Sequence, residues 1–537
     1  MLQVSSLGKR FNDKKLFENV NLQFFEGNIY GIIGANGAGK STFLKILSKE
    51  IEPSSGQIII DKGKRISVLG QDHNQYNDMV VTDIVIMGND QLFKIKEEKD
   101  AIYMNPDSTE KDYERAGVLE EKFGLMGGYT AENDAQHLLS SLRISKEKWN
   151  VPLKDLKANE KVKVLLAKAL FGNPDILIMD EPTNHLDLIS IKWLEKFLQE
   201  YENIVIVVSH DSDFLDEICT NIVDIDFGEA RMFTGNYSFW KESSQLALEM
   251  KKKTNLKKEE QAEKLKSFIA RFSANASKSS QATSRKKELE KITLDEIKPS
   301  NRKYPFIQWE INRNPGKQIL HVEDLSLSND KGEWLFQNVS FTMNANEKVA
   351  LIGDDDIAKT RFLEVLLGLR QPTSGKVEWG KTIKTSYFPN DNSKFFETNE
   401  TILEWIAKWP LENEIAENKD NSDHRMRSFL GRMLFSGDSV FKNASVTSGG
   451  EKARLMFSKM MLEEANFLVL DQPLDHLDTE SIDSVIDGLN QYKSSAIFTT
   501  YNRALVKKAA NVILEIGPEE SFIFRGTLDE YDEVRKL

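Results

Sequence analysis

The sequence has little cysteine and no long apolar run. A single cysteine, Cys219, stands among 537 residues, which excludes a disulfide scaffold and any metal or redox site that needs two cysteines of one chain. No apolar run approaches the roughly 18 residues that a membrane-spanning helix needs. The first residues, MLQVSSLGKRF, lack the apolar centre of a signal peptide. We therefore expect a cytoplasmic protein that is not itself a membrane permease.

Positive charge is also scarce, but it is unevenly distributed. Against 84 Asp and Glu there are 71 Lys and Arg, and the net charge of −13 would by itself disfavour a nucleic-acid partner. Residues 251–303, however, hold 16 Lys and Arg against seven Asp and Glu, a net of +9, so the rest of the chain sums to −22. With 40% apolar and 29% charged residues, a chain of this length predicts a soluble protein of two or three domains.

One α/β unit occurs twice. Residues 16–47, LFENVNLQFFEGNIYGIIGANGAGKSTFLKIL, recur at 335–366 as LFQNVSFTMNANEKVALIGDDDIAKTRFLEVL. Further along, NPDILIMDEPTNHLD at 173–187 recurs at 465–478 as ANFLVLDQPLDHLD. The first stretch has the pattern of strand, turn, strand, loop and helix in both copies. We therefore predict an α/β fold with two tandem domains.

The first copy carries an insertion. From Lys40 to Asp180 there are 140 residues, whereas the equivalent separation from Lys359 to Asp471 is 112. The charged stretch at about 86–135 favours helix, and we predict a helical arm there. A surface insertion without function is the alternative.

Between the two domains, predicted at 1–243 and 306–537, lies a basic segment at 244–305. Apolar residues at helical spacing predict a helix near 245–272, and the polar run at 273–284 predicts a tip, so we expect two antiparallel helices. A charged helical linker is ordinarily a solvated spacer, but a charge opposite to that of the other residues favours an anionic target. The candidate RNA contacts are Arg271, Lys278, Arg285, Lys286 and Lys287.

GANGAGKS at 34–41 fits the phosphate-binding loop that joins an apolar strand to a helix. Its glycines let backbone N–H groups surround phosphates, Lys40 reaches the β- and γ-phosphates, and the Ser41 hydroxyl binds Mg²⁺. The apolar strand ILIM ends in Asp180, placed to hold the metal, and Glu181, placed to orient or deprotonate the attacking water. The nucleotide-binding residues predicted here are Gly34, Ala35, Asn36, Gly37, Ala38, Gly39, Lys40, Ser41, Thr42 and Asp180.

Two such units resemble the twin nucleotide-binding domains of an ATP-binding cassette protein, whose signature element appears as TSGGE at 447–451. By this resemblance Gln71 matches the family's Q-loop glutamine, His210 its switch histidine, and Phe11 the aromatic residue that stacks on adenine. Twin cassettes with a basic helical linker resemble the ABC-F branch, and ARFSANASKSSQATSRKK in the linker resembles its YbiT/YkpA-type group. The resemblance implies ATP and Mg²⁺, with the metal held by Ser41, Gln71 and Asp180.

The second copy departs from the pattern at most chemical positions. Its loop, GDDDIAKT at 353–360, carries three carboxylates that would repel phosphates. Gln472 stands where Glu181 stands, and an amide cannot act as a general base. The first copy's own signature is altered to LKANE at 156–160. The residues of this degenerate site are Gly353, Lys359, Thr360, Asp471, Gln472 and Tyr501, the last of which matches His210.

In the cassette family each ATP lies between the phosphate loop of one domain and the signature of the other. Pairing the elements crosswise gives one intact site and collects every altered element in the second site. We therefore predict a monomer with two cassettes and one hydrolytic site, where Glu181 and His210 are catalytic; a static nucleotide at the second site is the alternative. The residues expected in trans at the intact site are Ser448, Gly449, Gly450 and Glu451.

The ABC-F resemblance implies an ATP-driven translation factor. Its partners would be ribosomal RNA and tRNA, with the protein in the exit-tRNA site, the linker near the peptidyl tRNA, and no transmembrane partner. Four alternatives stay open: ribosome protection against antibiotics, an ATPase subunit of a transporter, a DNA-associated ATPase, and a nonhydrolytic module that uses ATP as structural glue. The short polar tip favours a housekeeping role over antibiotic resistance.

Overall fold

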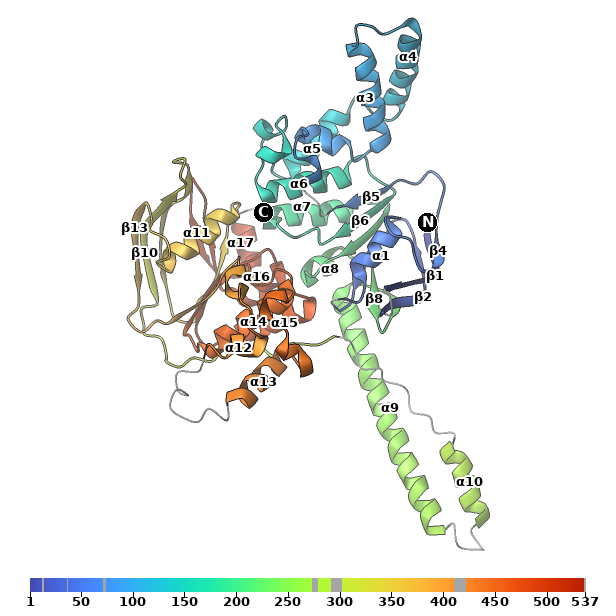
Figure 1. The fold of residues 1–537 in the computed structure, drawn as a ribbon, viewed down its shortest axis with the longest axis vertical. Helices are drawn as coiled ribbons and strands as arrows, with labels where there is room; N and C mark the ends of the chain where they lie inside the picture. The colour runs from blue at the N-terminus through green and yellow to red at the C-terminus, as the bar shows by residue number, and fades with distance from the viewer. Residues whose placement is uncertain are drawn as a thin grey trace.

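The computed structural model describes residues 1–11, 14–35, 37–70, 74–272, 279–290, 302–409 and 422–535. Two α/β cassettes lie side by side (Figure 1). A helical pair extends from the first cassette at one end of the molecule, and a longer helical pair extends from the opposite end.

The first cassette contains two sheets. Its central sheet has the spatial order β5 (Ile66–Leu69), β6 (Ile176–Asp180), β7 (Ile204–Val208), β3 (Ile29–Ile33), β8 (Asn221–Asp226) and β9 (Glu229–Thr234). The first five strands run parallel, and β9 is antiparallel. An antiparallel sheet consists of β2 (Lys14–Phe24), β1 (Leu2–Phe11) and β4 (Ser55–Ile60). The helices are α1 (Lys40–Leu47), α2 (Val81–Ile86), α5 (Ala131–Ser141), α6 (Ala158–Leu170), α7 (Leu188–Gln199) and α8 (Ser212–Ile218).

The second cassette repeats this plan. Its central sheet has the order β14 (Thr385–Phe388), β15 (Phe467–Asp471), β16 (Ser495–Thr499), β12 (Lys348–Ile352), β17 (Val512–Glu515) and β18 (Phe522–Arg525). The antiparallel sheet is β11 (Trp334–Met343), β10 (Leu320–Ser328) and β13 (Ser374–Trp379). Its helices are α11 (Asp356–Leu366), α12 (Ile402–Ile406), α13 (Ser422–Arg432), α14 (Gly449–Leu462), α15 (Thr479–Gln491), α16 (Arg503–Ala509) and α17 (Leu528–Arg535). The equivalent strand order in both halves confirms the predicted fold class.

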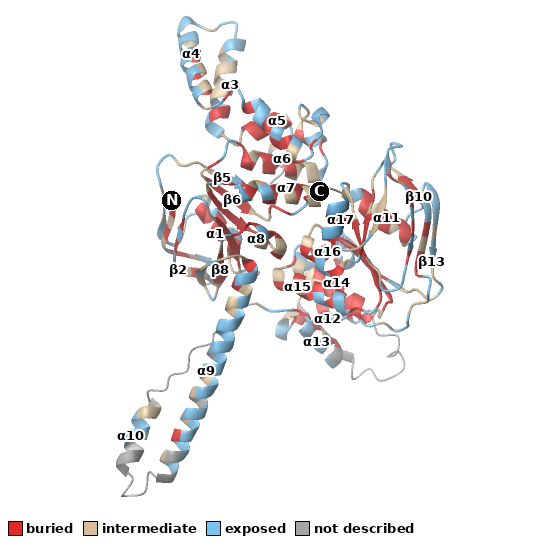
Figure 2. Ribbon diagram, turned by 180° about the vertical axis from the view of Figure 1, so that it is seen from behind, coloured by how far each residue is buried: buried red, intermediate tan, exposed pale blue. Residues whose placement is uncertain are grey.

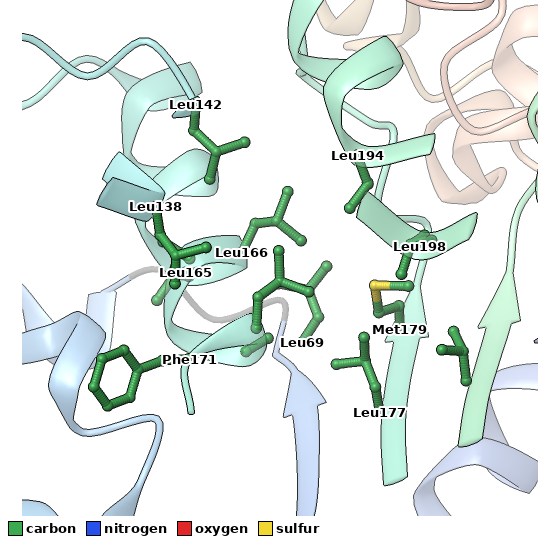
Figure 3. Packing of buried hydrophobic residues seen from close by; sticks show 14 of the residues in the cluster. Leu69, Leu138, Leu142, Leu165, Leu166, Phe171, Leu177, Met179, Leu194 and Leu198 are labelled. Carbon is green, nitrogen blue, oxygen red and sulfur yellow. The ribbon is translucent and has the colours of Figure 1, made fainter. Parts of the chain in front are cut away.

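The central strands are covered on both faces. Every residue of β3 and β7 is buried, as continuous apolar strands in a parallel sheet require. Figure 3 shows Leu165 of α6 and Leu198 of α7 packed over Leu69 and Leu177 of the neighbouring strands β5 and β6. Burial of each such side chain contributes about 1.5–3 kcal/mol. This core fixes the carboxyl edge of the sheet, from which the loops of the nucleotide site emerge.

The insertion forms an antiparallel arm of α3 (Asp90–Met104) and α4 (Glu110–Leu125), which projects from the first cassette (Figure 1). Thr109 and Asp112 form a capping box at the start of α4. Soon after the helix ends, Gly127 adopts a φ of 75°, which glycine tolerates best. Both helices lie within the stretch predicted to form the arm.

The linker contains α9 (Tyr237–Phe272) and α10 (Ser279–Glu290), side by side in Figure 1. The 36 residues of α9 span about 54 Å at 1.5 Å per residue. Gln261 of α9 donates to Glu288 of α10 at 3.5 Å, and Leu265 is buried near this contact. Beyond its base, α9 is largely exposed (Figure 2).

The two linker helices start earlier than the sequence predicted. Instead of beginning near 245, α9 starts at Tyr237, because the Asn236 side chain accepts the Phe239 N–H at 3.1 Å as a helix cap. Trp240, in the first turn of α9, is buried in the core of the first cassette. The second helix starts at Ser279, inside the run 273–284 that was expected to be the tip. Helix-tolerant Ala and Gln in this run extend the helix.

Candidate nucleotide sites

The first phosphate loop joins the buried strand β3 to α1. A Cβ on Gly34, where φ is 154°, would lie 2.4 Å from the carbonyl oxygen of Ile225, so the backbone must pass too close for any side chain. Lys40 is buried and donates from Nζ to the Gly34 carbonyl at 2.7 Å. Burial lowers the pKa of Lys40. The loop thus surrounds an ammonium group at the N-terminus of α1, a place that favours anions.

The other described loop residues occupy the same turn and the start of α1: Ala35, Gly37, Ala38, Gly39, Ser41 and Thr42. Asn36 lies outside the described residues, as does Gln71, the predicted third metal ligand. Asp180 ends β6, where burial raises its pKa and a hydrogen bond from the Ser41 side chain opposes that rise. A hydroxyl and a carboxylate, both hard oxygen donors, suit Mg²⁺.

Glu181 and His210 lie together beyond the ends of β6 and β7. The backbone N–H of His210 donates to Glu181 Oε2 at 3.1 Å, and His210 Nε2 lies 3.5 Å from Glu181 Oε1. Burial raises the pKa of Glu181 to about 8 and lowers the pKa of His210 to about 3. A buried carboxyl group with a raised pKa is a stronger proton acceptor once ionised, as a general base requires.

These groups line a cavity of about 270 Å³, and Glu181 and His210 also line an adjoining cavity of about 600 Å³. The lining of the smaller cavity combines loop N–H groups, the Lys40 ammonium and the Asp180 and Glu181 carboxyl groups. The loop N–H groups, the Lys40 ammonium and the Asp180 carboxylate suit the phosphates and their metal, and Glu181 suits a water molecule at their far side. The residues that line the smaller cavity are Gly37, Gly39, Lys40, Ser41, Thr42, Asp180, Glu181, Val208 and His210.

Thr479, a residue of the second cassette, contacts His210 of this site and was not predicted from the sequence. His210 Nδ1 lies 3.0 Å from the hydroxyl of Thr479, the first residue of α15. The signal was present in the repeat, because Thr479 occupies the position of Leu188 in the first copy. Leu188 in turn lines a cavity with Tyr501, which replaces the histidine in the second copy. A polar pair thus spans the cassettes at the first site, whereas at the second site the equivalent residues, Leu188 and Tyr501, line a common cavity.

The TSGGE signature starts α14. Ser448 caps this helix, with Glu451 N–H donating to the Ser448 hydroxyl at 3.3 Å and Ser448 N–H donating to Glu451 at 2.7 Å. A Cβ on Gly450 would lie 2.9 Å from the carbonyl oxygen of His476, and one on Gly449 3.1 Å from the His476 ring. The glycines therefore let the signature pack against the adjacent loop. None of the residues lining the 270 Å³ cavity belongs to this signature, so the crosswise pairing at the intact site stays a prediction.

In the second phosphate loop, after Gly353, aspartates occupy the positions that would receive phosphate. Helix α11 starts at Asp356, three residues ahead of Lys359, whereas α1 starts at Lys40 itself. The Asp355 carboxylate accepts the N–H groups of Ile357 and Ala358 at 2.9 and 3.4 Å. Lys359 Nζ lies 2.8 Å from Asp356, which also accepts the Tyr501 hydroxyl. Internal carboxylates thus satisfy both the helix N-terminus and the loop lysine.

The hydroxyl and carboxyl groups of Thr360 and Asp471 at the second site are also bonded within the protein, whereas the Gln472 side-chain nitrogen is buried without a hydrogen-bond partner in the described part of the chain. Thr360 donates to Asp471 at 2.7 Å, and Asp471 accepts a second hydroxyl, from Thr499, at 2.7 Å. Burial raises the pKa of Asp471. The backbone N–H of Gln472 donates to Thr499 at 2.9 Å, and the Gln472 side chain is buried.

The LKANE segment meets this second loop directly. Lys157 Nζ donates to Asp355 at 2.5 Å, and the Asn159 side chain donates to the carbonyl oxygen of Asp354 at 2.8 Å. Arg143 adds an ion pair with Asp354 at 3.1 Å. At this site a protein–protein contact therefore joins the altered signature to the altered loop.

Those of the other predicted contacts whose side chains the structure describes are exposed. Phe11 ends β1 with 49% of its surface exposed, and Lys9 Nζ lies 5.2 Å from its ring centroid. Arg285, Lys286 and Lys287 are exposed on α10. The side chains of Arg271 and Lys278 lie outside the described residues. None of the helices in the described part of the chain has the length and apolar character that crossing a bilayer requires.

Comparison with known proteins gives consistent matches along the chain. Residues 17–184 and 336–475 match a family model described as "ABC transporter", and residues 223–309 match a second model of that description. The chain is 49% identical to the ATP-binding protein YkpA of Bacillus subtilis, with 99% of this chain and 97% of that protein aligned. It is 42% identical to the ATP-binding protein YbiT of Escherichia coli O157:H7, with 99% of each aligned.

Two more distant proteins share this arrangement. ABC transporter F family member 2 of Arabidopsis thaliana is 30% identical, over 96% of this chain and 76% of that protein. Among solved structures, an archaeal ribosome recycling factor in complex with a ribosomal stalk protein matches with a TM-score of 0.59 and 17% identity, over 99% of this chain and 92% of that one. At that identity the match bears on the fold, that is, two cassettes on one chain.

Proposed function

Because the chain belongs to the ABC-F family of ATP-binding cassette proteins, and is similar to its YkpA and YbiT members, we propose that it is a translation factor with one hydrolytic ATP site. ATP-binding cassettes bind and hydrolyse ATP, and the proposal assigns hydrolysis to the first phosphate loop alone. This assignment rests on the contrast between the two phosphate loops. Lys40 faces a cavity with Glu181 at its edge, whereas Lys359 is paired with Asp356 and Gln472 replaces the base.

At the first site each side chain has a separate task. Lys40 and the loop N–H groups bind the β- and γ-phosphates. Ionised Glu181 accepts a proton from the attacking water. Neutral His210 is held in position by its contacts with Glu181 and Thr479. When bound by Ser41 and Asp180, Mg²⁺ supplies positive charge against the phosphate oxygens.

The second site serves as the fixed side of a clamp. Ion pairs from Lys157 and Arg143 to the aspartate loop join the cassettes there with protein groups alone. ATP at the first site draws in Ser448, Gly449 and Gly450 from the second cassette, and hydrolysis releases them. The functional unit is one chain, because both halves of each site are on it.

The partner of the closed form is the ribosome. Support comes from the family, from the ribosome recycling factor that shares the fold, and from the basic linker on an otherwise acidic chain. The cassettes occupy the exit-tRNA site, and the linker approaches the peptidyl tRNA and ribosomal RNA. This role places the protein in the cytoplasm, with no transmembrane partner.

Replacement of Glu181 by Gln tests the proposal. Because an amide cannot accept the proton, E181Q binds ATP but releases phosphate at least about 100-fold more slowly, the lower range for loss of a general base. Its closed form accumulates on ribosomes with ATP, which sedimentation through a sucrose cushion measures. E132Q, an exposed carboxylate on α5, is the matched control and behaves like the wild-type chain. Ribosome association of E181Q that is the same with and without ATP would refute the clamp.

A further inference from the structure

The first turn of α15 contacts three separate parts of the molecule. Thr479 lies 3.0 Å from His210 at the hydrolytic site. The next residue, Glu480, lies 2.9 Å from Arg302, where the chain returns from the linker. One turn further, Asp483 accepts from Lys241 in the first turns of α9 at 2.8 Å. We name this turn, Thr479 to Asp483, the α15 junction.

Arg302 connects the junction to the sheet of the first cassette. Its guanidinium donates to Asp224 of β8 at 2.6 Å and lies 3.9 Å from Asp226, while Nε faces Glu480. It also lies over the ring of Trp240 at 4.7 Å, so it contacts α9 as well. Only 14% of the arginine side chain and 7% of that of Glu480 are exposed. Buried partners of this kind cannot be replaced by water without a large cost, so these groups move together.

Both ends of the linker contact the α15 junction, through Lys241 at one end and Arg302 at the other. Lys241 lies on α9 as the chain leaves the first cassette, and Arg302 lies where it comes back. Both basic residues pair with acidic residues three positions apart on α15, which share one face of that helix. Glu480 stands where the first copy has Ile189, so the junction is a feature of the second copy alone.

We propose that the α15 junction couples the ATP site to the linker, with Glu480 as its positioning residue. This inference rests on the proposed function, namely that ATP closes the cassettes at the first site. A change at His210 displaces Thr479, and the same rigid turn displaces Glu480 and Asp483. Through Arg302 and Lys241, that displacement tilts the linker against the first cassette. By reciprocity, a target held by the linker alters the affinity of the first site for ATP.

Spin-label distances in the full chain test the coupling. The native cysteine, Cys219, is buried, so labels go to introduced cysteines at exposed positions. K266C on α9 with K62C on the first cassette reports linker tilt, and K62C with K381C on the second cassette reports closure. All chains carry E181Q to retain ATP. We expect ATP to shift both distances, and E480Q to abolish the shift in the linker distance while leaving that in the closure distance.

Two further variants keep the test decisive. E480Q leaves Arg302 paired with Asp224 and Asp226, so the fold is expected to persist, and thermal unfolding checks it. D483N cuts only the contact to Lys241 and is expected to reduce the linker shift, should E480Q fail to fold. E229Q removes an exposed pair with Arg231 on the neighbouring strand β9 and serves as the control.

The outcomes separate the two proposals. If ATP shifts neither distance in the chain with an intact junction, the proposed clamp is wrong. If closure occurs but the linker shift persists in both E480Q and D483N, the cassettes close as proposed and the junction does not couple them to the linker. A linker shift reduced equally by E229Q also overturns the inference, because the effect would then be one of general stability.

Discussion

Glu181 is held at a left-handed backbone position, with φ of 54°, and its side chain is buried against His210. Strand β6 ends just before Glu181, and the Glu181 N–H donates to the carbonyl oxygen of Val208 at 2.8 Å. Such strain at a non-glycine residue persists where surrounding contacts determine the backbone. The geometry thus maintains a largely buried carboxyl group at the edge of the cavity, and burial raises its pKa to about 8.

The raised pKa of Glu181 predicts a pH-dependent stability difference between E181Q and the wild-type chain. In the unfolded chain this carboxyl group loses its proton near pH 4.5, but in the folded chain only near pH 8. Ionisation therefore favours unfolding between these values, at up to about 1.4 kcal/mol per pH unit. We expect E181Q to gain stability relative to the wild type as pH rises through this window, measured by urea unfolding. Parallel curves for the two chains would contradict the burial of this carboxyl group.

The converse change, Q472E, is expected to leave ATP hydrolysis within about twofold of the wild-type rate, because one restored base does not restore a phosphate site. Asp355 and Asp356 would still hold the N-terminus of α11 and Lys359. The new carboxyl group would also be buried beside Asp471, which lowers stability. Steady-state phosphate release measures the first effect and thermal unfolding the second. A tenfold gain in turnover would mean that the second site is less damaged than we propose.

At the scale of elements, the helices that follow the two phosphate loops begin at different positions of the repeat. Helix α1 begins at Lys40, whereas α11 begins at Asp356, three residues earlier in the repeat. The Asp355 side chain caps α11, but the glycines of the first loop provide no such cap. The sequence predicted the central strands and the first loop well, since continuous apolar runs and closely spaced glycines are local signals. It placed the starts of α9 and α10 too late, because one cap at Asn236 and a few helix-tolerant residues decided them.

The contact between LKANE and the aspartate loop predicts a specific coupling between Lys157 and Asp355. K157M and D355N each remove the ion pair, and asparagine retains the cap of α11. A double-mutant cycle by urea unfolding should give a coupling of roughly 0.2–1 kcal/mol, because the Lys157 side chain is about half exposed.

The matched cycle combines K157M with D354N. The Asp354 side chain pairs with Arg143, and only its carbonyl oxygen meets the LKANE segment, through Asn159. These two changes should therefore be additive. Equal coupling in both cycles would mean that general electrostatics, and not the Lys157 pair, accounts for the effect.

At the scale of the whole molecule, the contacts between cassettes were the least predictable part. Thr479 and Arg302 carry no motif, and their partners lie 269 residues away for Thr479 and in both cassettes for Arg302. The sequence could pair the loops and signatures only through the family resemblance. Which protein groups meet across the interface depends on how the two folded domains pack against each other. Local sequence patterns do not predict these contacts.

The segregation of charge over the molecule predicts how binding to RNA responds to salt. The linker is basic and projects from cassettes that are acidic, so phosphate contacts should concentrate on it. K286Q with K287Q removes two exposed charges of α10. Each lost phosphate contact reduces the slope of log affinity against log salt by about 0.7–0.9, so the loss of two contacts should reduce it by up to about 1.4–1.8.

The control for this change is K62Q with K381Q, which removes one exposed lysine from each cassette and the same total charge. Ribosome binding measured across a series of salt concentrations should show the wild-type slope for this control and a shallower slope for the linker variant. Because both variants shift the net charge equally, a common change in slope would assign the salt dependence to the overall field of the protein. A change confined to the linker variant would place the phosphate contacts on α10. This helix belongs to the basic linker, whereas the cassettes are acidic overall and would repel phosphate groups.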